Sequence, residues 1–317
     1  MDFQFEILIN DCFMGKKFTL SLSNDYEDGE WRYEKFSNFI WDSIQYTALS
    51  AKERNYFNKN NLHTSSNKSA KANLRKARIL DRDGNPQKDL MKRASSELGE
   101  IFLYGLLHFH FNALPVVPKI FYKQNTQDNA KGADSVHIMI DASNNDFSLW
   151  FGEAKFYNNI GDSRLDSIIE SVEKSLQTSS IKKENSIICG LNDLDFLLQD
   201  KQGLLRKIKQ ALDPIDPNTS IDTLKSKIHI PILILYQCSI SEKYKIYSDK
   251  YKTEISNYHK DRAKKYFEKQ DNKLKSTIHL YDEIFFHFII FPIPSEDRII
   301  EDYLKELGLL DNGQSIR

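Results

Sequence analysis

The most informative segments of the sequence are Gly132-Ala-Asp-Ser-Val-His-Ile-Met-Ile-Asp141 and Phe147-Ser-Leu-Trp-Phe-Gly-Glu-Ala-Lys-Phe156. Both segments are largely apolar, and the polar residues Asn144-Asn145-Asp146 between them favour a turn, so the pair is predicted to form a β-hairpin. Side chains two apart in a strand project to the same face, so Glu153 and Lys155 share a face from which Ala154 points away.

The hairpin brings two acids and a lysine toward one place. Asp134 lies about as far before the turn as Glu153 lies after it. Antiparallel pairing would therefore place Asp134 across from Glu153 and Lys155. Two carboxylates that hold a divalent metal ion, with a lysine beside them, form an arrangement that hydrolyses phosphodiesters. The apolar flanks of Glu153 predict an interior strand, where unpaired charges are costly, and this favours a metal site over a structural salt bridge.

The composition is that of a globular protein whose charges are unevenly distributed. The 317 residues are 40% hydrophobic, 28% charged and 12% aromatic, which suits one large domain or two with a substantial core. The net charge is −1, but residues 1–51 carry nine acids against four bases, and residues 52–93 carry twelve bases against four acids. The basic segment 52–93 predicts a contact with DNA phosphates or, equally, a solvated or partner-facing surface.

The chain shows no sign of a membrane or an oxidising compartment. No apolar run reaches the ~20 residues that span a bilayer, and the N-terminus lacks the basic region and cleavage site of an export signal. Cys12, Cys189 and Cys238 are far apart and odd in number, which is typical of reduced thiols rather than a zinc site or disulfides. We therefore expect a cytoplasmic protein without a membrane contact.

An acid-bearing helix is predicted upstream of the hairpin, over residues 95–111. It is apolar nearly all round, and Ser95 or Ser96 is expected to cap it. Glu97 and Glu100 would then lie in its first turns, where the helix dipole favours negative charge. We expect this helix to be central and its acids to lie near the hairpin.

The rest of the chain alternates strand and helix patterns. In order, we predict a hairpin over 3–9 and 17–23, a helix over 33–53, a long loop or weak helix over 55–75, a turn at 83–86 and a short strand over 119–123. After the central hairpin we predict a helix over 161–178, further helix over 192–226 broken at Asp213-Pro214 and Asp216-Pro217, a buried strand over 228–237 in which Pro231 confines central pairing to later residues, a long charged helix over 241–276, a buried strand over 284–293 and a terminal helix over 295–310.

The order of these central elements resembles the core of the PD-(D/E)xK, or restriction-endonuclease-like, nucleases. The resemblance implies an α/β fold with a mixed sheet flanked by helices. It also implies that the Asp and Glu hold Mg²⁺, with Mn²⁺ as a substitute, while the Lys orients or deprotonates the attacking water. Residues 95–317 would form the nuclease core as one compact unit, and residues 1–94 an N-terminal α+β elaboration that contacts a partner or DNA.

Three motifs narrow the resemblance: SELGEIFLYGLL at 96–107, KGADSVHI at 131–138 and LWFGEAKFY at 149–157. They are similar to those of the HamA family, the nuclease subunit of the Hachiman anti-phage defence system. The family implies a DNA-degrading nuclease in a heterodimer with a superfamily 2 helicase, HamB. Carried over by position, Asp134, Glu153 and Lys155 are the catalytic set. Glu100 would complete the metal shell of Asp134 and Glu153, with Glu97 as its substitute.

Two further interpretations are open. A fold alone does not establish an activity. The chain could instead be a non-catalytic DNA-binding or helicase-regulating subunit in which Asp134, Glu153 and Lys155 form a structural ion pair. His137 lies three residues after Asp134 and faces the opposite side of an ideal strand, so it is a possible accessory residue only. His287 is more typical of a core histidine.

Overall fold

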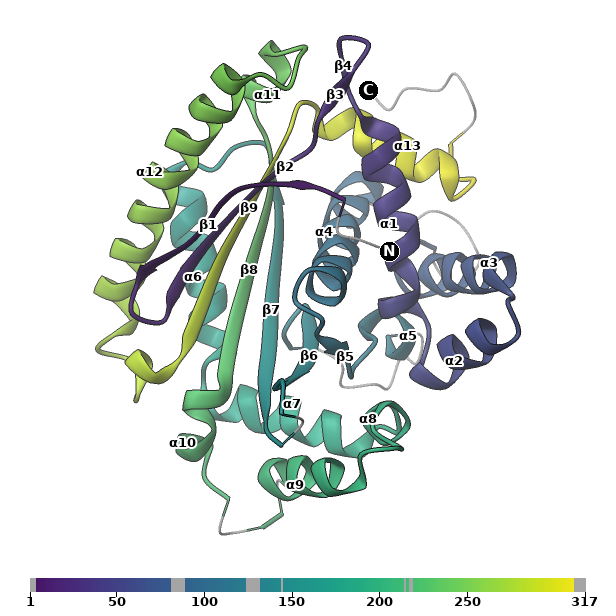
Figure 1. Ribbon diagram of the computed structural model, residues 1–317, viewed down its shortest axis with the longest axis vertical. Coiled ribbons are helices and arrows are strands. Elements are labelled where there is room, and N and C mark those ends of the chain that lie inside the picture. Colours follow the sequence, from purple (N-terminus) through teal and green to yellow (C-terminus); the bar gives the residue numbers. More distant parts are fainter. Residues whose placement is uncertain are drawn as a thin grey trace.

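A seven-stranded mixed sheet forms the centre of the molecule (Figure 1). The computed structural model describes residues 4–80, 89–123, 132–143, 145–213, 215–216 and 219–310. The sheet order is β1-β2-β9-β8-β7-β6-β5. Its strands are β1 (Glu6–Met14), β2 (Lys17–Ser23), β5 (Leu114–Pro115), β6 (Ser135–Ile140), β7 (Phe147–Tyr157), β8 (Ile228–Gln237) and β9 (Phe285–Ile293). The predicted α/β class with a mixed sheet is confirmed.

The strands pair in parallel in the middle of the sheet and antiparallel at its two ends. β2, β9, β8 and β7 are parallel neighbours, whereas β1–β2, β7–β6 and β6–β5 are antiparallel. The central strands β8 and β9 are apolar on both faces, as strands covered from both sides must be. A separate two-stranded ribbon is formed by β3 (Tyr26–Glu27) and β4 (Glu30–Trp31).

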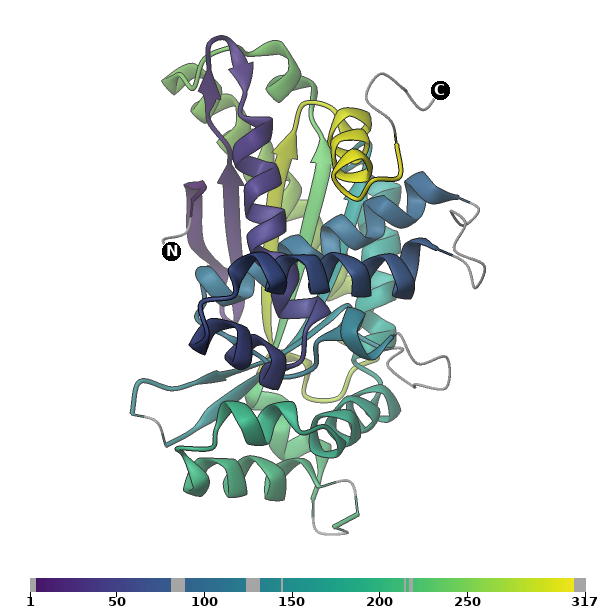
Figure 2. The same ribbon diagram turned by 90° about the vertical axis from the view of Figure 1, so that its right-hand side faces the viewer.

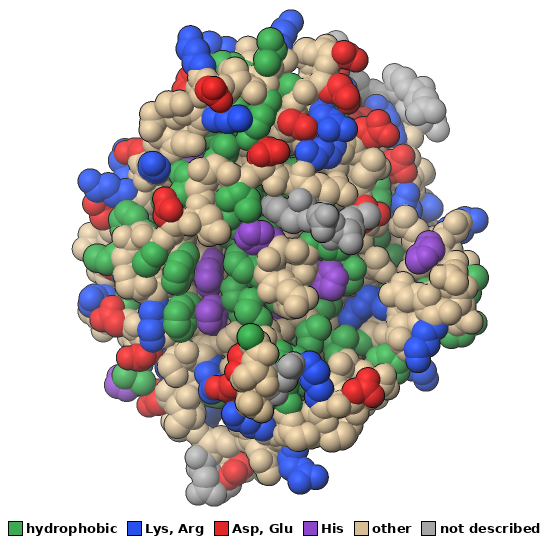
Figure 3. Space-filling view, viewed as in Figure 1, with side chains coloured by type: hydrophobic (Ala, Val, Ile, Leu, Met, Phe, Trp, Pro, Cys, Tyr) green, Lys and Arg blue, Asp and Glu red, His purple; other side chains and the backbone are tan. Residues whose placement is uncertain are grey.

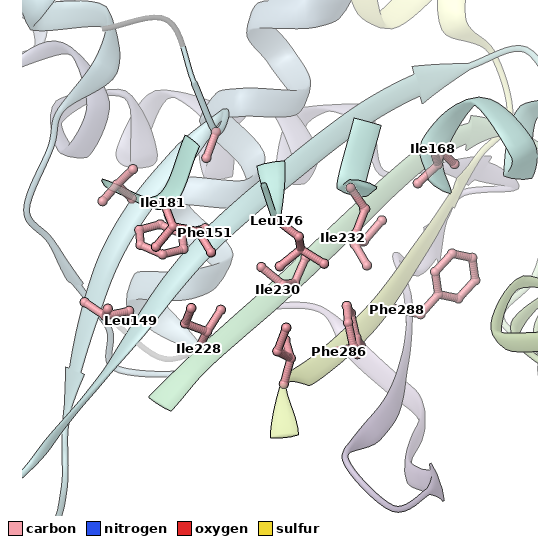
Figure 4. Packing of buried hydrophobic residues seen from close by; sticks show 14 of the residues in the cluster. Leu149, Phe151, Ile168, Leu176, Ile181, Ile228, Ile230, Ile232, Phe286 and Phe288 are labelled. Carbon is pink, nitrogen blue, oxygen red and sulfur yellow. The ribbon is translucent and has the colours of Figure 1, made fainter. Parts of the chain in front are cut away.

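Helices cover both faces of the sheet (Figures 1 and 2). On one face lie α1 (Tyr33–Ala48), α4 (Leu90–Phe109) and α13 (Glu296–Glu306), and α3 (His63–Leu74) packs against α1. On the other lie α6 (Asp162–Ser175) and α12 (Asp249–Leu274). Figure 4 shows apolar side chains of β7, β8 and β9 packed with Ile168 and Leu176 on the α6 side. Among the described residues, no helix is long and apolar enough to cross a membrane.

Seven further helices in the described ranges pack around this core. They are α2 (Ala51–Lys59), α5 (Lys119–Tyr122), α7 (Thr178–Gly190), α8 (Asp193–Leu197), α9 (Gln202–Leu212), α10 (Ile221–Leu224) and α11 (Ser239–Lys243). Helical turns of other kinds span Arg75–Ile79, Lys225–Lys227 and Tyr281–Glu283. In Figure 1, α7 to α10 lie together below the ends of β6, β7 and β8.

The N-terminal predictions are partly wrong in their boundaries. The predicted helix over 33–53 is two helices, because Ser50 begins α2 with a capping box that Glu53 completes. Residues 55–75, expected to be a loop or a weak helix, fall largely in α2 and α3, which pack on α1 and on each other. Tertiary packing thus compensates for the polar sequence of these helices. The predicted turn at 83–86 lies outside the described residues.

The predictions around the acid-bearing helix need two corrections. α4 begins at Leu90, so Ser95 does not cap it; the Ser95 hydroxyl instead donates to Oε1 of Glu296 at 2.8 Å. Glu97 and Glu100 therefore lie in the body of α4. Residues 119–123 form the helix α5 rather than a strand. A helix places Lys119 and Lys123 one turn apart, and both are paired with acids, as described below.

Later boundaries differ in detail. β8 pairs with β9 from His229 onward, before Pro231, so the expected limit on central pairing is wrong; Pro231 itself faces His287 of β9. The long helix α12 begins at Asp249, after the separate α11. Residues 1–94 share the sheet and core of the remainder, since β2 pairs with β9 and Phe36 packs against Phe102. The role of residues 1–94 in contacting a partner or DNA stays a prediction.

Candidate active site

The hairpin of β6 and β7 fixes Asp134 beside Glu153 and Lys155. Ser135 pairs with Gly152, so the next position along each strand brings Asp134 level with Glu153. The backbone N–H of Ala154 donates to Oδ2 of Asp134 at 3.0 Å. Lys155 Nζ lies 4.0 Å from the same Oδ2 and hydrogen-bonds Oε1 of Glu153. The two carboxylates and the ammonium therefore converge as the strand pattern predicts.

Glu153 and Ala154 point to opposite faces of the sheet. The hydroxyl of Ser171, on α6, also donates to Oε1 of Glu153, so Glu153 faces α6. Ala154 faces α4, since a Cβ placed on Gly99 of that helix would lie 3.5 Å from the Ala154 Cβ. Glu153 thus accepts hydrogen bonds from two side chains at one oxygen, Oε1.

A third carboxylate acts on Asp134 from α4. Glu100 has a nearly buried side chain that pairs with Lys123, the residue that follows α5, 3.2 Å from Nζ to Oε2. Burial, the charge of Glu153 and the charge of Glu100 together raise the pKa of Asp134 to about 7, against the opposing effect of Lys155. Asp134 is therefore repelled both by Glu153 on the neighbouring strand and by Glu100 on α4.

Lys155 is the cation that balances this charge. Burial alone would lower its pKa, but Glu153 and Asp134 outweigh burial and raise it. Lys155 therefore carries a positive charge at neutral pH. Its side chain is 27% exposed, and that of Asp134 is 24% exposed, so both remain within reach of a ligand from solvent.

Two predicted accessory residues are placed differently. Glu97 is buried in α4, three residues before Glu100. His137 is fully buried on the face covered by α4, with its ring 4.7 Å from that of Tyr104. Burial holds the pKa of His137 well below its usual range, so it is neutral. His137 thus lies across the sheet from Glu153 and takes no part in the group of acids.

The other histidines lie outside the group. His287 is nearly buried and hydrogen-bonds His229 at 2.9 Å, within a row of stacked rings that includes Trp150. This agrees with the interpretation of His287 as a core histidine. Figure 3, viewed as Figure 1, shows hydrophobic and His side chains gathered over the middle of the molecule.

Several residues that contact the site were missed in the sequence. Ser171 reaches Glu153 only through the docking of α6, and a lone serine in a helix gives no signal. Lys123 lies in a segment expected to be a strand. Lys119 and Glu184 form a buried pair behind Asp134 and are distant in sequence. Only the packing of α5, α6 and α7 brings these residues to the hairpin.

The donor set suits a hard divalent cation. Asp134 and Glu153 offer carboxylate oxygens, and their mutual repulsion would be relieved by an ion between them. In the part of the chain that the structure describes, no three His, Cys, Asp or Glu side chains are already gathered as a metal-binding cluster. Mg²⁺ commonly uses one or two carboxylates and keeps water and phosphate as its other ligands, so the pair Asp134 and Glu153 fits it.

One known protein family matches most of this chain. The sequence model of HamA matches residues 5–307, which is nearly the whole chain. The chain belongs to the HamA family. Membership of HamA supports a role in Hachiman anti-phage defence and a nuclease-like protein. The match covers β1 through α13, so it includes the hairpin and the N-terminal strands alike. A search of curated proteins found no match.

Proposed function

We propose that this HamA protein is a metal-dependent DNA nuclease, the effector subunit of a complex with a superfamily 2 helicase. The observation that supports the proposal most is the gathering of Asp134, Glu153 and Lys155 at the end of β6 and β7. Carboxylates on adjacent strands with a charged lysine match the chemistry of phosphodiester hydrolysis.

Each side chain has a separate task in this proposal. Asp134 and Glu153 would hold Mg²⁺, or Mn²⁺ in its place, with Glu100 as the nearby third acid. The bound ion supplies an acidified water and neutralises charge on the phosphate. Lys155 stays protonated, so it donates hydrogen bonds to the attacking water or to a phosphate oxygen as negative charge develops. Ser171 and the Ala154 N–H hold the two carboxylates in place.

Two bases of the segment 52–93 that the structure describes, Arg54 and Lys71, already have partners within the protein. Arg54 is nearly buried and donates to the carbonyl oxygens of Leu49 and Pro115. Lys71 pairs with Glu306 and lies over the Trp41 ring. On the face shown in Figure 3, Lys and Arg alternate with Asp and Glu. We propose that DNA is contacted by exposed Lys and Arg side chains near the hairpin and by the helicase subunit.

The second candidate function is that of a non-catalytic subunit that binds DNA or regulates the helicase. Its specific support is the direct Lys155–Glu153 pair, which already neutralises one of the acids. In that case Asp134, Glu153 and Lys155 would only stabilise the hairpin.

Degradation of plasmid DNA by purified protein separates the two functions. The assay compares Mg²⁺ with EDTA, and the chain alone with the chain bound to its helicase partner. The nuclease proposal predicts Mg²⁺-dependent loss of plasmid in at least one condition, abolished by Glu153→Ala and by Lys155→Ala. If the wild type and both variants behave alike in both conditions, the catalytic proposal fails and the second function is favoured.

A further inference from the structure

A buried ion pair lies directly behind the backbone that carries Asp134. Lys119 Nζ of α5 lies 3.0 Å from Oε2 and 3.3 Å from Oε1 of Glu184 on α7. The two side chains are 0% and 5% exposed, respectively. The pair joins two elements that flank the hairpin but belong to different parts of the chain.

Glu184 also holds the chain just before Asp134. The backbone N–H of Ala133 donates to Oε1 of Glu184 at 2.9 Å. On its other side, the Asp134 carboxylate accepts the Ala154 N–H at 3.0 Å. Asp134 is therefore held in two places: Glu184 binds the backbone that precedes it, and β7 binds its carboxylate.

Gly132 shows how closely Glu184 approaches this backbone. A Cβ added at Gly132 would lie 1.7 Å from Oε1 and 2.9 Å from the carboxyl carbon of Glu184. Any side chain at position 132 would displace the carboxylate or the strand entrance. The glycine of the Gly132-Ala133-Asp134 sequence is thus explained by the contact with Glu184.

Stability alone is a poor explanation of such a pair. Two buried charges lose their hydration, and apolar residues of similar volume often stabilise a fold as well or better. A carboxylate that accepts a backbone N–H does supply a short, directional bond. Lys119 contacts both oxygens of that carboxylate and so limits its rotation.

We propose that Glu184, held by Lys119, is a positioning residue that sets the Ala133–Asp134 backbone so that the Asp134 carboxylate meets the metal ion. This role rests on the proposed nuclease function. Glu184 contacts Lys119 and the Ala133 N–H, so it would act on a bound ion through Asp134. Outer hydrogen-bond partners of metal ligands commonly change metal affinity or activity by about 10- to 100-fold.

The test uses Mn²⁺ binding, measured by electron paramagnetic resonance, together with DNA cleavage by the complex with its helicase. Glu184→Ala and Gly132→Ala should each weaken Mn²⁺ binding about tenfold and lower kcat about tenfold. KM for DNA should change by less than about twofold, because DNA contacts are untouched. Glu184→Gln keeps an oxygen for the Ala133 N–H and should recover both values to within about threefold of the wild type.

Asp271→Ala is the matched control, because Asp271 pairs with the nearly buried Lys17 of β2, far along the sheet from β6. It should lower Tm while leaving Mn²⁺ affinity and kcat unchanged. If Glu184→Ala also lowers Tm but leaves Mn²⁺ affinity and kcat unchanged, the positioning role is wrong and the pair is structural. Should Glu184→Ala fail to fold, Gly132→Ala decides in the same way. Asp134→Asn separates the two proposals: if it binds Mn²⁺ like the wild type, the metal site itself is wrong, whatever Glu184 does.

Discussion

The backbone N–H of Ala154 donates a 3.0 Å hydrogen bond to Oδ2 of Asp134. This bond joins the residue between Glu153 and Lys155 to the acid that precedes the partner strand. Asp134 thereby lies beside the side chains of Glu153 and Lys155 without belonging to the same strand. Such a link makes the geometry of the three residues a property of the hairpin, and changes within the hairpin should alter them together.

The acids should make stability depend on pH in an unusual direction. Burial and the charges of Glu153 and Glu100 raise the pKa of Asp134 to about 7, whereas an unfolded aspartate titrates near ~3.9. Between these values the folded state binds more protons, so the free energy of unfolding falls as pH rises. Without divalent ions, Tm should fall from pH 5 to pH 8, and Asp134→Asn should reduce that fall and raise Tm at pH 8.

Asp146→Asn is the control for this measurement. A hydrogen bond from Lys227 lowers the pKa of Asp146 to about 2, so this group is charged in both states between pH 5 and pH 8. Its removal should leave the slope of Tm with pH unchanged in that range. An equal slope in the wild type and in Asp134→Asn would contradict the account of the acids.

Ser171 should matter for cleavage more than for folding. Its hydroxyl donates to Oε1 of Glu153, whereas the hydroxyl of Ser175, one turn later on α6, donates to the carbonyl oxygen of Val172. Ser171→Ala should lower kcat about tenfold, because Glu153 loses one of the two donors that orient it. Ser175→Ala should leave kcat unchanged. Equal kcat values for both variants would show that Ser171 does not orient Glu153.

Lys123 should compete with a metal ion for the charge of Glu100. Its Nζ lies 3.2 Å from Oε2 of Glu100, at the acid that acts on Asp134 from α4. Lys123→Gln removes one cation beside that negative charge, so Mn²⁺ should bind a few-fold more tightly in calorimetric titration. Lys209→Gln removes a similar pair, with Asp195, and should have no effect. Unchanged or weaker binding by Lys123→Gln would rule out Glu100 as a contributor to the metal site.

The strand patterns predicted the core of the site because period-two alternation fixes which side chains share a face. Glu153 and Lys155 needed only that rule, and Asp134 needed only the symmetry of the hairpin about its turn. β8 and β9 were predicted equally well, since their long apolar runs are typical of buried strands. Local sequence patterns were therefore enough to predict the central strands and the convergence of Asp134, Glu153 and Lys155.

The helices were harder to predict because their environment decides them. α5 has only four residues, and its sequence resembles that of a short strand. The ion pairs of Lys119 with Glu184 and of Lys123 with Glu100 exist only in the folded protein. α4 extends back to Leu90, and Ser95 within it donates to Glu296 of α13 instead of capping a helix. Contacts between residues far apart in sequence also explain why Ser171 and Glu184 could not be assigned to the site beforehand.

Single-turnover cleavage by the helicase complex shows whether Asp134, Glu153 and Lys155 catalyse DNA hydrolysis. DNA affinity is measured on the same preparations in Ca²⁺, so binding and chemistry are separated. We expect Lys155→Met and Glu153→Gln to slow cleavage by at least about 100-fold with DNA affinity nearly unchanged, and Lys252→Met on α12 to cleave like the wild type. Cleavage by Lys155→Met and Glu153→Gln at the wild-type rate would contradict a catalytic role of Glu153 and Lys155.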